Sequence, residues 1–382
     1  MGAALRVSQG RPPLSTNGGP VNVLLTFNDE NQCAPEFTRV LHGLGHAVHH
    51  LQLSGHQPIL QDPAYQERVL ARLEETIQAL AIELYFPLFE EVFFLSAHEP
   101  KCRTLYCTPQ TYADLHLKRR AAPFCQRHGL PHIPTHLLEP ETGADELNRL
   151  GKSPFFLKED NSRGGHGSEV YPDARSLLAS VPGAPSQYVV QPCVNGELWV
   201  IQGVFREGSL WDYEILRKLS FWNVQGTVRK LPFHRVESNP RALELLREVG
   251  RLTHYQGMLE FECLGQGDDL QIMEFNPRFS ADFVHATQTG SNFCLNTVRA
   301  YAGQEALPHR SVEGPITRNA WKLIRSVGRQ APRRLALLDP RWPIRWMLAE
   351  ASAGWTRLRH PYGAFKATPD SYRRLDFPAS GA

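Results

Sequence analysis

The amino-acid sequence predicts a fold of mixed α/β and α+β class, with two or three lobes around a shared cleft. Its 382 residues exceed the length of one typical domain. Residues 21–113 alternate apolar strand-like runs with helical patterns, which is typical of an open parallel sheet. From about Asp114 onward several strands follow one another and a β-hairpin closes the series. This second pattern indicates an antiparallel sheet with attached helices in residues 114–312.

The first lobe is expected to begin after a mobile tail, because residues 1–20 are rich in Gly, Pro and Ser and carry no periodicity. The run VNVLLTF at 21–27 is apolar throughout and predicts a buried parallel strand. The other elements predicted for this lobe are a helix at 35–44, a strand at 47–53, a helix at 64–80, a strand at 83–89, a short helix at 90–98, a strand at 103–107 and a helix from Pro109.

The second block contains more strands than helices. The predicted elements are a helix at 115–129, a strand at 154–160 with a Gly-rich loop behind it, a short helix at 174–181, strands at 187–194, 197–205 and 209–219, an amphipathic helix at 239–255, a hairpin of 257–264 with 270–275, and a helix at 291–303. Gly and Asp residues in GQGDD at 265–269 predict the turn of that hairpin.

Composition excludes several classes of protein. The formal net charge of +2 gives no reason to expect nucleic-acid binding. No apolar run is long enough to cross a bilayer, and the start of the chain lacks a signal-peptide pattern, so we expect a cytoplasmic protein without a membrane partner. Seven dispersed cysteines without CxxC spacing argue against disulfides and structural zinc. His46, His49 and His50 are interpreted as surface or core residues rather than metal ligands.

The hairpin carries the clearest chemical signal. Glu274 and Asn276 are two residues apart in one strand and therefore share a face, and strand pairing would place Glu260 beside them. Three oxygen donors on one face suit Mg²⁺, which takes its remaining ligands from water and phosphates. Arg278 follows directly and could hold a phosphate or a carboxylate. The alternative is a solvated hairpin that ends in an ordinary Asn-Pro turn.

A second signal is the segment FFLKEDNSRGGHGSEV at 155–170. Lys158 ends an apolar strand, and the glycines that follow allow backbone N–H groups to point at phosphate oxygens. The segment is not a Walker A loop, in which the lysine comes after the glycines. Taken alone, this pattern fits a flexible β-hairpin turn better than a phosphate-binding loop.

The order of these motifs resembles that of the ATP-grasp superfamily. The sequence shows a basic helix with Lys118, then the Lys158 Gly-rich hairpin, then QYVVQPCVNGE at 187–197, then the E…E-x-N-P-R hairpin. The stretch HATQTGSNFCLNTVRAYAG at 285–303 also resembles the segment that follows N-P-R in carbamoyl-phosphate-synthase-type members. The resemblance covers about residues 21–305. It implies a Rossmann-like pre-ATP-grasp domain at 21–113 and an ATP-grasp domain at 114–312, whose lid spans about 120–190.

The resemblance also assigns roles to individual residues. Lys118 and Lys158 would contact phosphates, and Arg278 would lie near the transferred phosphoryl group. Gln191 departs from the Glu that many relatives carry, but its amide oxygen can accept from the adenine amino group. The matching positions are the lid loop Gly164, Gly165, His166, Gly167 and Ser168; the adenine linker Gln191, Pro192, Cys193 and Val194, with Val194 as the N–H donor; Glu197 at the ribose; and the magnesium ligands Glu260, Glu274 and Asn276.

The implied function is an ADP-forming carboxylate–amine ligase that uses ATP with Mg²⁺, or Mn²⁺ in its place. Two alternatives stay open: an enzyme that activates bicarbonate or another small acid, and a non-catalytic ATP-binding module. Small-molecule carboxylate and amine substrates are the expected partners, and a homodimer formed through the first lobe would fit the sequence. Candidate substrate contacts are Asn28, Asp29, Glu30, Glu90 and Glu91 beyond strand ends, and Arg217, Lys218, Arg229 and Lys230 in or after a later strand.

The last segment, residues 313–382, is rich in Arg and Trp. We interpret it as amphipathic helices that pack their tryptophans on the main body and leave their arginines in water. A binding surface for an acidic or phosphorylated partner is the alternative.

Overall fold

The computed structural model describes most of the chain up to Thr317. The described residues are 19–27, 33–53, 63–95, 98–151, 154–162, 167–181, 183–218, 223–224, 227–228, 233–286, 291–317 and 373–376. Residues 1–18 of the tail predicted at 1–20, and most of the Arg/Trp-rich segment, therefore lie outside the described residues.

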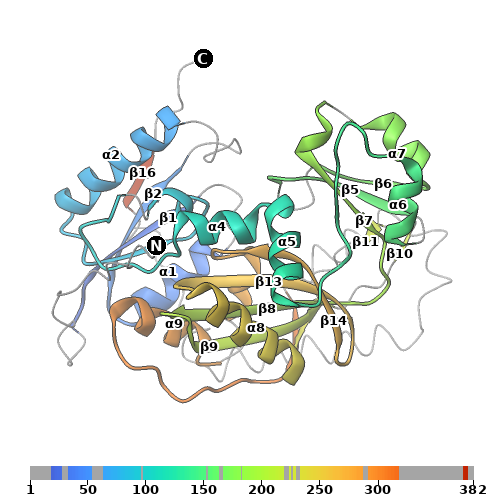
Figure 1. Cartoon of the computed structure of the whole chain (residues 1–382). Coiled ribbons are helices and arrows are strands. Elements are labelled where there is room, and N and C mark those ends of the chain that lie inside the picture. The colour runs from blue at the N-terminus through green and yellow to red at the C-terminus, as the bar shows by residue number, and fades with distance from the viewer. Residues whose placement is uncertain are drawn as a thin grey trace, which may run out of the picture.

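The first lobe (residues 19–107) is a parallel sheet between two helices (Figure 1). Its apolar strands pack both faces, as the sequence predicts: Leu25 lies in one core cluster with Phe37 of α1, and Leu24 in another with Leu73 of α2. The strand order is β16-β2-β1-β3. The elements are β1 (Asn22–Phe27), α1 (Ala34–Gly43), β2 (Ala47–Gln52), α2 (Pro63–Ala79), β3 (Leu84–Pro87), α3 (Val92–Leu95) and β16 (Arg373–Asp376).

One prediction for the region after β3 is wrong and another is shifted. The strand expected at 103–107 is reduced to a single bridge between Arg103 and Leu84. The helix expected from Pro109 is α4 (Pro109–His116), and the helix expected at 115–129 is α5 (Lys118–His128), which begins three residues later than predicted. They are separated by Leu117, whose extended backbone (φ −75°, ψ 118°) ends the first helix and starts the second. The domain boundary expected between residues 113 and 114 falls inside α4.

A small antiparallel sheet forms a separate lobe (residues 130–192), at the upper right of Figure 1. Its strand order is β4-β7-β5-β6, and its core contains Phe155 and Leu157 of β5 with Leu177 of α7. The elements are β4 (His136–Leu137), α6 (Ala144–Leu150), β5 (Phe155–Glu159), β6 (Ser168–Tyr171), α7 (Ala174–Ser180), η1 (Pro185–Gln187) and β7 (Tyr188–Pro192).

The central sheet connects the parts of the molecule. Its order is β14-β13-β8-β9-β12-β15, and every pair in it is antiparallel. One face packs against α4, α5 and α8 through residues such as Phe205 and Phe261, and the other contributes Val204 and Met258 to the first-lobe core. The elements are β8 (Glu197–Arg206), β9 (Ser209–Lys218), β12 (Phe233–Val236), α8 (Pro240–Thr253), β13 (Gly257–Gln266), β14 (Asp269–Asn276), η2 (Ala281–His285), α9 (Phe293–Ala302) and β15 (Gly314–Thr317), beside a separate ladder of β10 (Asn223–Val224) and β11 (Thr227–Val228).

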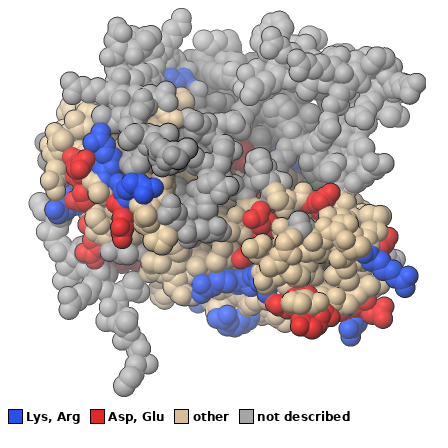
Figure 2. All heavy atoms as spheres, turned by 90° about the horizontal axis from the view of Figure 1, so that it is seen from above, with Lys and Arg blue, Asp and Glu red and all other residues tan. Residues whose placement is uncertain are grey.

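The structure also shows the cysteines, the histidine group, the helix lengths and the surface charges that were considered from composition. All seven cysteines are free, and all except Cys193 are buried, which confirms that they form no disulfide framework. His50 is buried and shares a hydrogen bond with Thr38 at 2.9 Å, as a core residue would. Among the described residues no helix has the length and apolar character needed to span a bilayer. Acidic and basic side chains are interspersed over the described part of the face in Figure 2.

Candidate functional site

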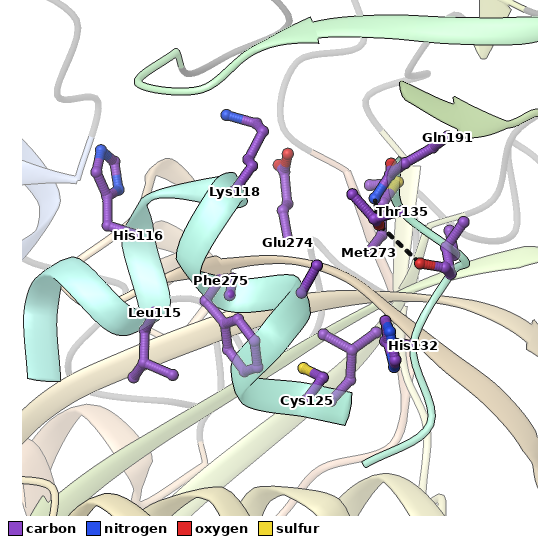
Figure 3. A pocket seen from close by; sticks show the side chains of 14 residues that line it. Leu115, His116, Lys118, Cys125, His132, Thr135, Gln191, Met273, Glu274 and Phe275 are labelled. Carbon is purple, nitrogen blue, oxygen red and sulfur yellow. Dashed lines mark hydrogen bonds between the residues drawn. The ribbon is translucent and has the colours of Figure 1, made fainter. Parts of the chain in front are cut away.

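A pocket lies where α4 and α5 meet β7 and β14 (Figure 3). Its lining includes His116, Lys118, Gln191 and Glu274, which come from segments far apart in the sequence. In Figure 3 the side chains of Lys118 and Glu274 extend side by side from the helix and the strand below. The fold thus brings a predicted phosphate contact, a predicted adenine contact and a predicted metal ligand to one pocket.

Lys118 is the first residue of α5, and the break at Leu117 places it at a helix start. Its Nζ donates to the carbonyl oxygens of Asp160 at 3.2 Å and Ser162 at 2.8 Å, directly after β5. Burial lowers the pKa of Lys118, and the opposing carboxylate of Glu274 favours its charged form. The lysine therefore connects the start of α5 to the turn at the end of β5.

The β5–β6 hairpin holds the second lysine. Lys158 is buried, and its ammonium lies 5.8 Å from the ring centre of Phe156. Gly167 directly precedes β6 with φ +61°, and the Cβ of any other residue there would approach the Glu159 side chain, so both conformation and space favour glycine. Gly167 and Ser168 are therefore placed beside β5, whereas Gly164, Gly165 and His166 lie outside the described residues.

The predicted adenine linker leaves β7 at Pro192. Gln191 is buried, and its Nε2 donates to Thr135 Oγ1 at 2.9 Å, the dashed line in Figure 3. Cys193 donates its backbone N–H to Pro154 O at 2.8 Å. That bond engages the amide of Cys193, which is consistent with the choice of Val194 as the adenine N–H donor.

The predicted metal ligands lie on the hairpin of β13 and β14, whose register shifts by one residue between Glu262 and Cys263. Glu260 is directly opposite Asn276, whose Nδ2 donates to Glu260 Oε1 at 3.1 Å, and Glu262 is opposite Glu274. Directly opposite residues share a face, so Glu260, Glu274 and Asn276 lie on one face of the hairpin. The set of carboxylate and amide oxygens fits Mg²⁺. Burial, with the nearby Asp282 carboxylate, raises the pKa of Glu260.

An ionic cluster that was not predicted from the sequence lies next to these ligands. Glu260, Glu262 and Asp282 have carboxylate oxygens within 4.8 Å of one another. Lys218 lies among them, with its Nζ 2.5 Å from Glu262 and 2.9 Å from Asp282. Although burial alone lowers the pKa of a lysine, these two carboxylates raise that of Lys218. Lys218, expected as a substrate contact, is thus paired with internal carboxylates. A second glutamate, two residues after Glu260 in the largely apolar run MLEFECL, was the available signal for Glu262.

Arg278 is held by residues of the first lobe. Its Nε lies 3.9 Å from Glu90 Oε1, and its guanidinium lies 5.8 Å from the ring centre of Phe89. Glu90, expected as a substrate contact, thus faces the predicted catalytic arginine.

His116 also lines the pocket but was not predicted from the sequence. It shares a 3.0 Å hydrogen bond with Asn161, and burial lowers its pKa to about 4. Its proximity to Lys118 in sequence was the only available signal.

Of the remaining candidate substrate and ribose contacts, some have protein partners and others lie outside the described residues. Glu197, expected at the ribose, forms an ion pair with Arg217, which also donates to Glu237 at 2.9 Å. Each therefore has a protein partner in this structure. Asn28, Asp29, Glu30, Arg229 and Lys230 lie outside the described residues.

Comparison with known proteins identifies the fold. No protein-family model and no curated protein matches the sequence. The chain is similar in structure to N5-carboxyaminoimidazole synthetase from Staphylococcus aureus complexed with ADP, with a TM-score of 0.62 and 13% identity over 83% of this chain and 87% of that one. It is also similar to the biotin carboxylase of Campylobacter jejuni, with a TM-score of 0.57 and 15% identity over 77% of this chain and 74% of that one.

A further similar structure is the L-amino acid ligase from Bacillus licheniformis. Here the TM-score is 0.55 and the identity 16%, over 74% of each chain. Identities this low show a shared fold alone and do not identify the reaction.

Proposed function

The chain has the ATP-grasp fold that its motif order predicts, and from this premise we propose that it binds Mg²⁺-ATP and activates a carboxylate for attack by an amine. The observation that carries the proposal is the convergence of Lys118, Gln191 and Glu274 on one pocket, beside the Glu260–Asn276 pair. These are the groups that a nucleotide with its metal ion requires.

ATP would lie between the β5–β6 hairpin and the central sheet. The linker after Gln191 would bind adenine, and the ammonium groups of Lys118 and Lys158 would face the phosphates. Glu260, Glu274 and Asn276 would hold Mg²⁺, which neutralises phosphate charge when bound. Phosphoryl transfer depends mainly on placement and charge neutralisation, and this site offers both.

The reaction has two balanced steps. A substrate carboxylate oxygen attacks the γ-phosphorus, so that a new O–P bond forms and ADP leaves. The amine nitrogen then attacks the acyl carbon, the C–N bond forms, and phosphate leaves with its electron pair while the amine loses a proton. Arg278 would neutralise charge on the transferred group, and Glu90 would hold its guanidinium in place.

The test is release of ADP and phosphate with Mg²⁺-ATP over a panel of carboxylic acids, with hydroxylamine as a surrogate nucleophile. Acid-dependent release together with a hydroxamate product would support the proposal and identify the acid. Turnover stimulated only by bicarbonate would favour the carboxylase alternative. Tight ATP binding that no acid converts to turnover, and that survives loss of Glu260 and Glu274, would favour a binding module.

A further inference from the structure

A row of polar side chains crosses the central sheet from the predicted metal site. Gln202 of β8 is directly opposite Glu260 of β13 on one side and Glu214 of β9 on the other. Glu260 is in turn opposite Asn276 of β14. Because directly opposite residues share a face, Asn276, Glu260, Gln202 and Glu214 form one continuous row. Gln202 is fully buried, with 0% of its surface exposed.

Gln202 differs from the other members of this row in its hydrogen bonding. Asn276 and Ser280 donate to Glu260, and Ser291 Oγ donates to Glu214 Oε1 at 3.1 Å. Among the described residues, neither the amide nitrogen nor the amide oxygen of Gln202 has a hydrogen-bond partner. Burying an amide without partners is costly, and such groups in native proteins call for an explanation. A ligand that both donates and accepts would satisfy both atoms.

The surroundings indicate the charge of that ligand. Gln202 lies between two glutamates, Glu260 and Glu214, and neighbouring strands are about 4.8 Å apart. Lys218, four residues from Glu214 along β9, is already engaged by Glu262 and Asp282. A cationic or hydrogen-bond-donating group is therefore favoured at Gln202, and a second carboxylate is disfavoured.

The distance to the reacting centre also fits. Glu260 would bind the metal beside the transferred phosphoryl group, and Gln202 is one strand away, about 5 Å along the sheet. Ser280 contacts Glu260 at one end of the row and Ser291 contacts Glu214 at the other. A group bound over Gln202 would thus lie next to the acyl phosphate, where the nucleophile is needed.

We propose that Gln202 and Glu214 form the subsite for the primary amine of the acceptor, a specificity-determining site that rests on the function proposed above. The Oε1 atom of Gln202 accepts from the amine, and its Nε2 donates to an oxygen of the acceptor or of the acyl group. Glu214 supplies the negative charge that attracts the ammonium form.

The test compares Gln202→Leu with the wild-type full chain. The leucine removes a buried amide without partners, so the melting temperature should stay the same or rise. The KM of the amine should increase about 10- to 100-fold, because a hydrogen bond to a charged group is lost. The KM values of ATP and of the acid, and hydroxamate formation with hydroxylamine, should change little. Glu214→Gln, which keeps an acceptor for Ser291, should raise the amine KM in the same way.

Other outcomes separate this inference from the proposed function. An unchanged amine KM in Gln202→Leu, or a lower melting temperature with all three KM values altered equally, would overturn the subsite and assign Gln202 a structural role. If no acid supports hydroxamate formation in the wild type, the proposed function fails. The subsite then stands only if glycine, β-alanine, ethanolamine or putrescine raises the melting temperature of the wild type and not of Gln202→Leu, and it is overturned otherwise.

Discussion

Lys218 and Glu262 form an ion pair across the central sheet, with 5% and 3% of their side chains exposed. Lys218 also contacts Asp282, so that one ammonium lies between two carboxylates beside Glu260. The ammonium offsets part of the negative charge of these carboxylates, on the same face of the sheet as the proposed metal ligands.

Lys218→Met should therefore destabilise the protein strongly. Removing one partner of a buried ion pair leaves uncompensated charge and costs about 3–5 kcal/mol of unfolding free energy. Urea unfolding measures the loss. Lys101→Met is the matched control, because Lys101 is 66% exposed and lies 3.7 Å from Glu74; its loss should cost less than about 1 kcal/mol. Equal effects of the two substitutions would contradict the role given to the pair.

Glu274→Ala should abolish ATP turnover and leave the fold intact. Glu274 is partly exposed in the pocket, so its removal loses a metal ligand without opening the core. Mn²⁺ titration in the presence of a non-hydrolysable ATP analogue should show weaker metal binding, and circular dichroism should be unchanged. Gln271→Ala, a half-buried position on the same strand, is the control and should retain turnover. Normal turnover in Glu274→Ala would refute the metal-site assignment.

Glu90→Gln should lower kcat about tenfold and leave the KM of ATP nearly unchanged, which corresponds to about 1.4 kcal/mol of transition-state stabilisation. The reason is that Glu90 of the first lobe, with its Oε1 3.9 Å from Arg278 Nε, would orient the arginine for phosphoryl transfer. Steady-state kinetics at saturating acid gives both values, and Glu90→Asp should recover part of the rate. A kcat equal to that of the wild type would show that the contact does not position the arginine.

Features of this structure that depend on residues close together in the sequence were easier to predict than features that depend on tertiary contacts. The hairpin register was only partly predictable. Unbroken pairing from the turn, where Gln266 lies opposite Asp269, would place Glu260 opposite Phe275, and the register shift between Glu262 and Cys263 brings it opposite Asn276 instead. Two helices were predicted before β4, but their boundary at Leu117 was not, since a single extended residue between two helical patterns leaves no mark in their periodicity.

The ionic cluster was hidden for a different reason. Lys218, Glu262 and Asp282 come from β9, β13 and η2, and only the tertiary fold brings them together. The same holds for β16, which joins the first-lobe sheet beside β2 from the far end of the chain. In the sequence, Gln202 is an ordinary polar residue in an apolar strand. Only the strand pairing shows that it lies between Glu260 and Glu214.

Glu91 should make the stability of the protein depend on pH between about 4.5 and 7. Burial raises the pKa of Glu91 from 4.5 to about 7, despite hydrogen bonds from Thr26 and Tyr85. Between these values the unfolded chain loses the proton and the folded protein retains it, so the unfolded state binds fewer protons and stability falls as the pH rises. At about 1.4 kcal/mol for each pH unit, the contribution amounts to about 3 kcal/mol.

Glu91→Gln isolates this contribution because glutamine still accepts from Thr26 and Tyr85 but does not titrate. Urea unfolding of the wild type and the variant at pH 4.5, 5.5, 6.5 and 7.5 should show the variant gaining relative stability with each step up to about pH 7. Glu67→Gln, at an exposed position on α2, should follow the wild-type curve throughout. A constant difference between Glu91→Gln and the wild type across this range would mean that Glu91 ionises normally, and that the buried contact with Thr26 is made by a carboxylate rather than by a neutral acid.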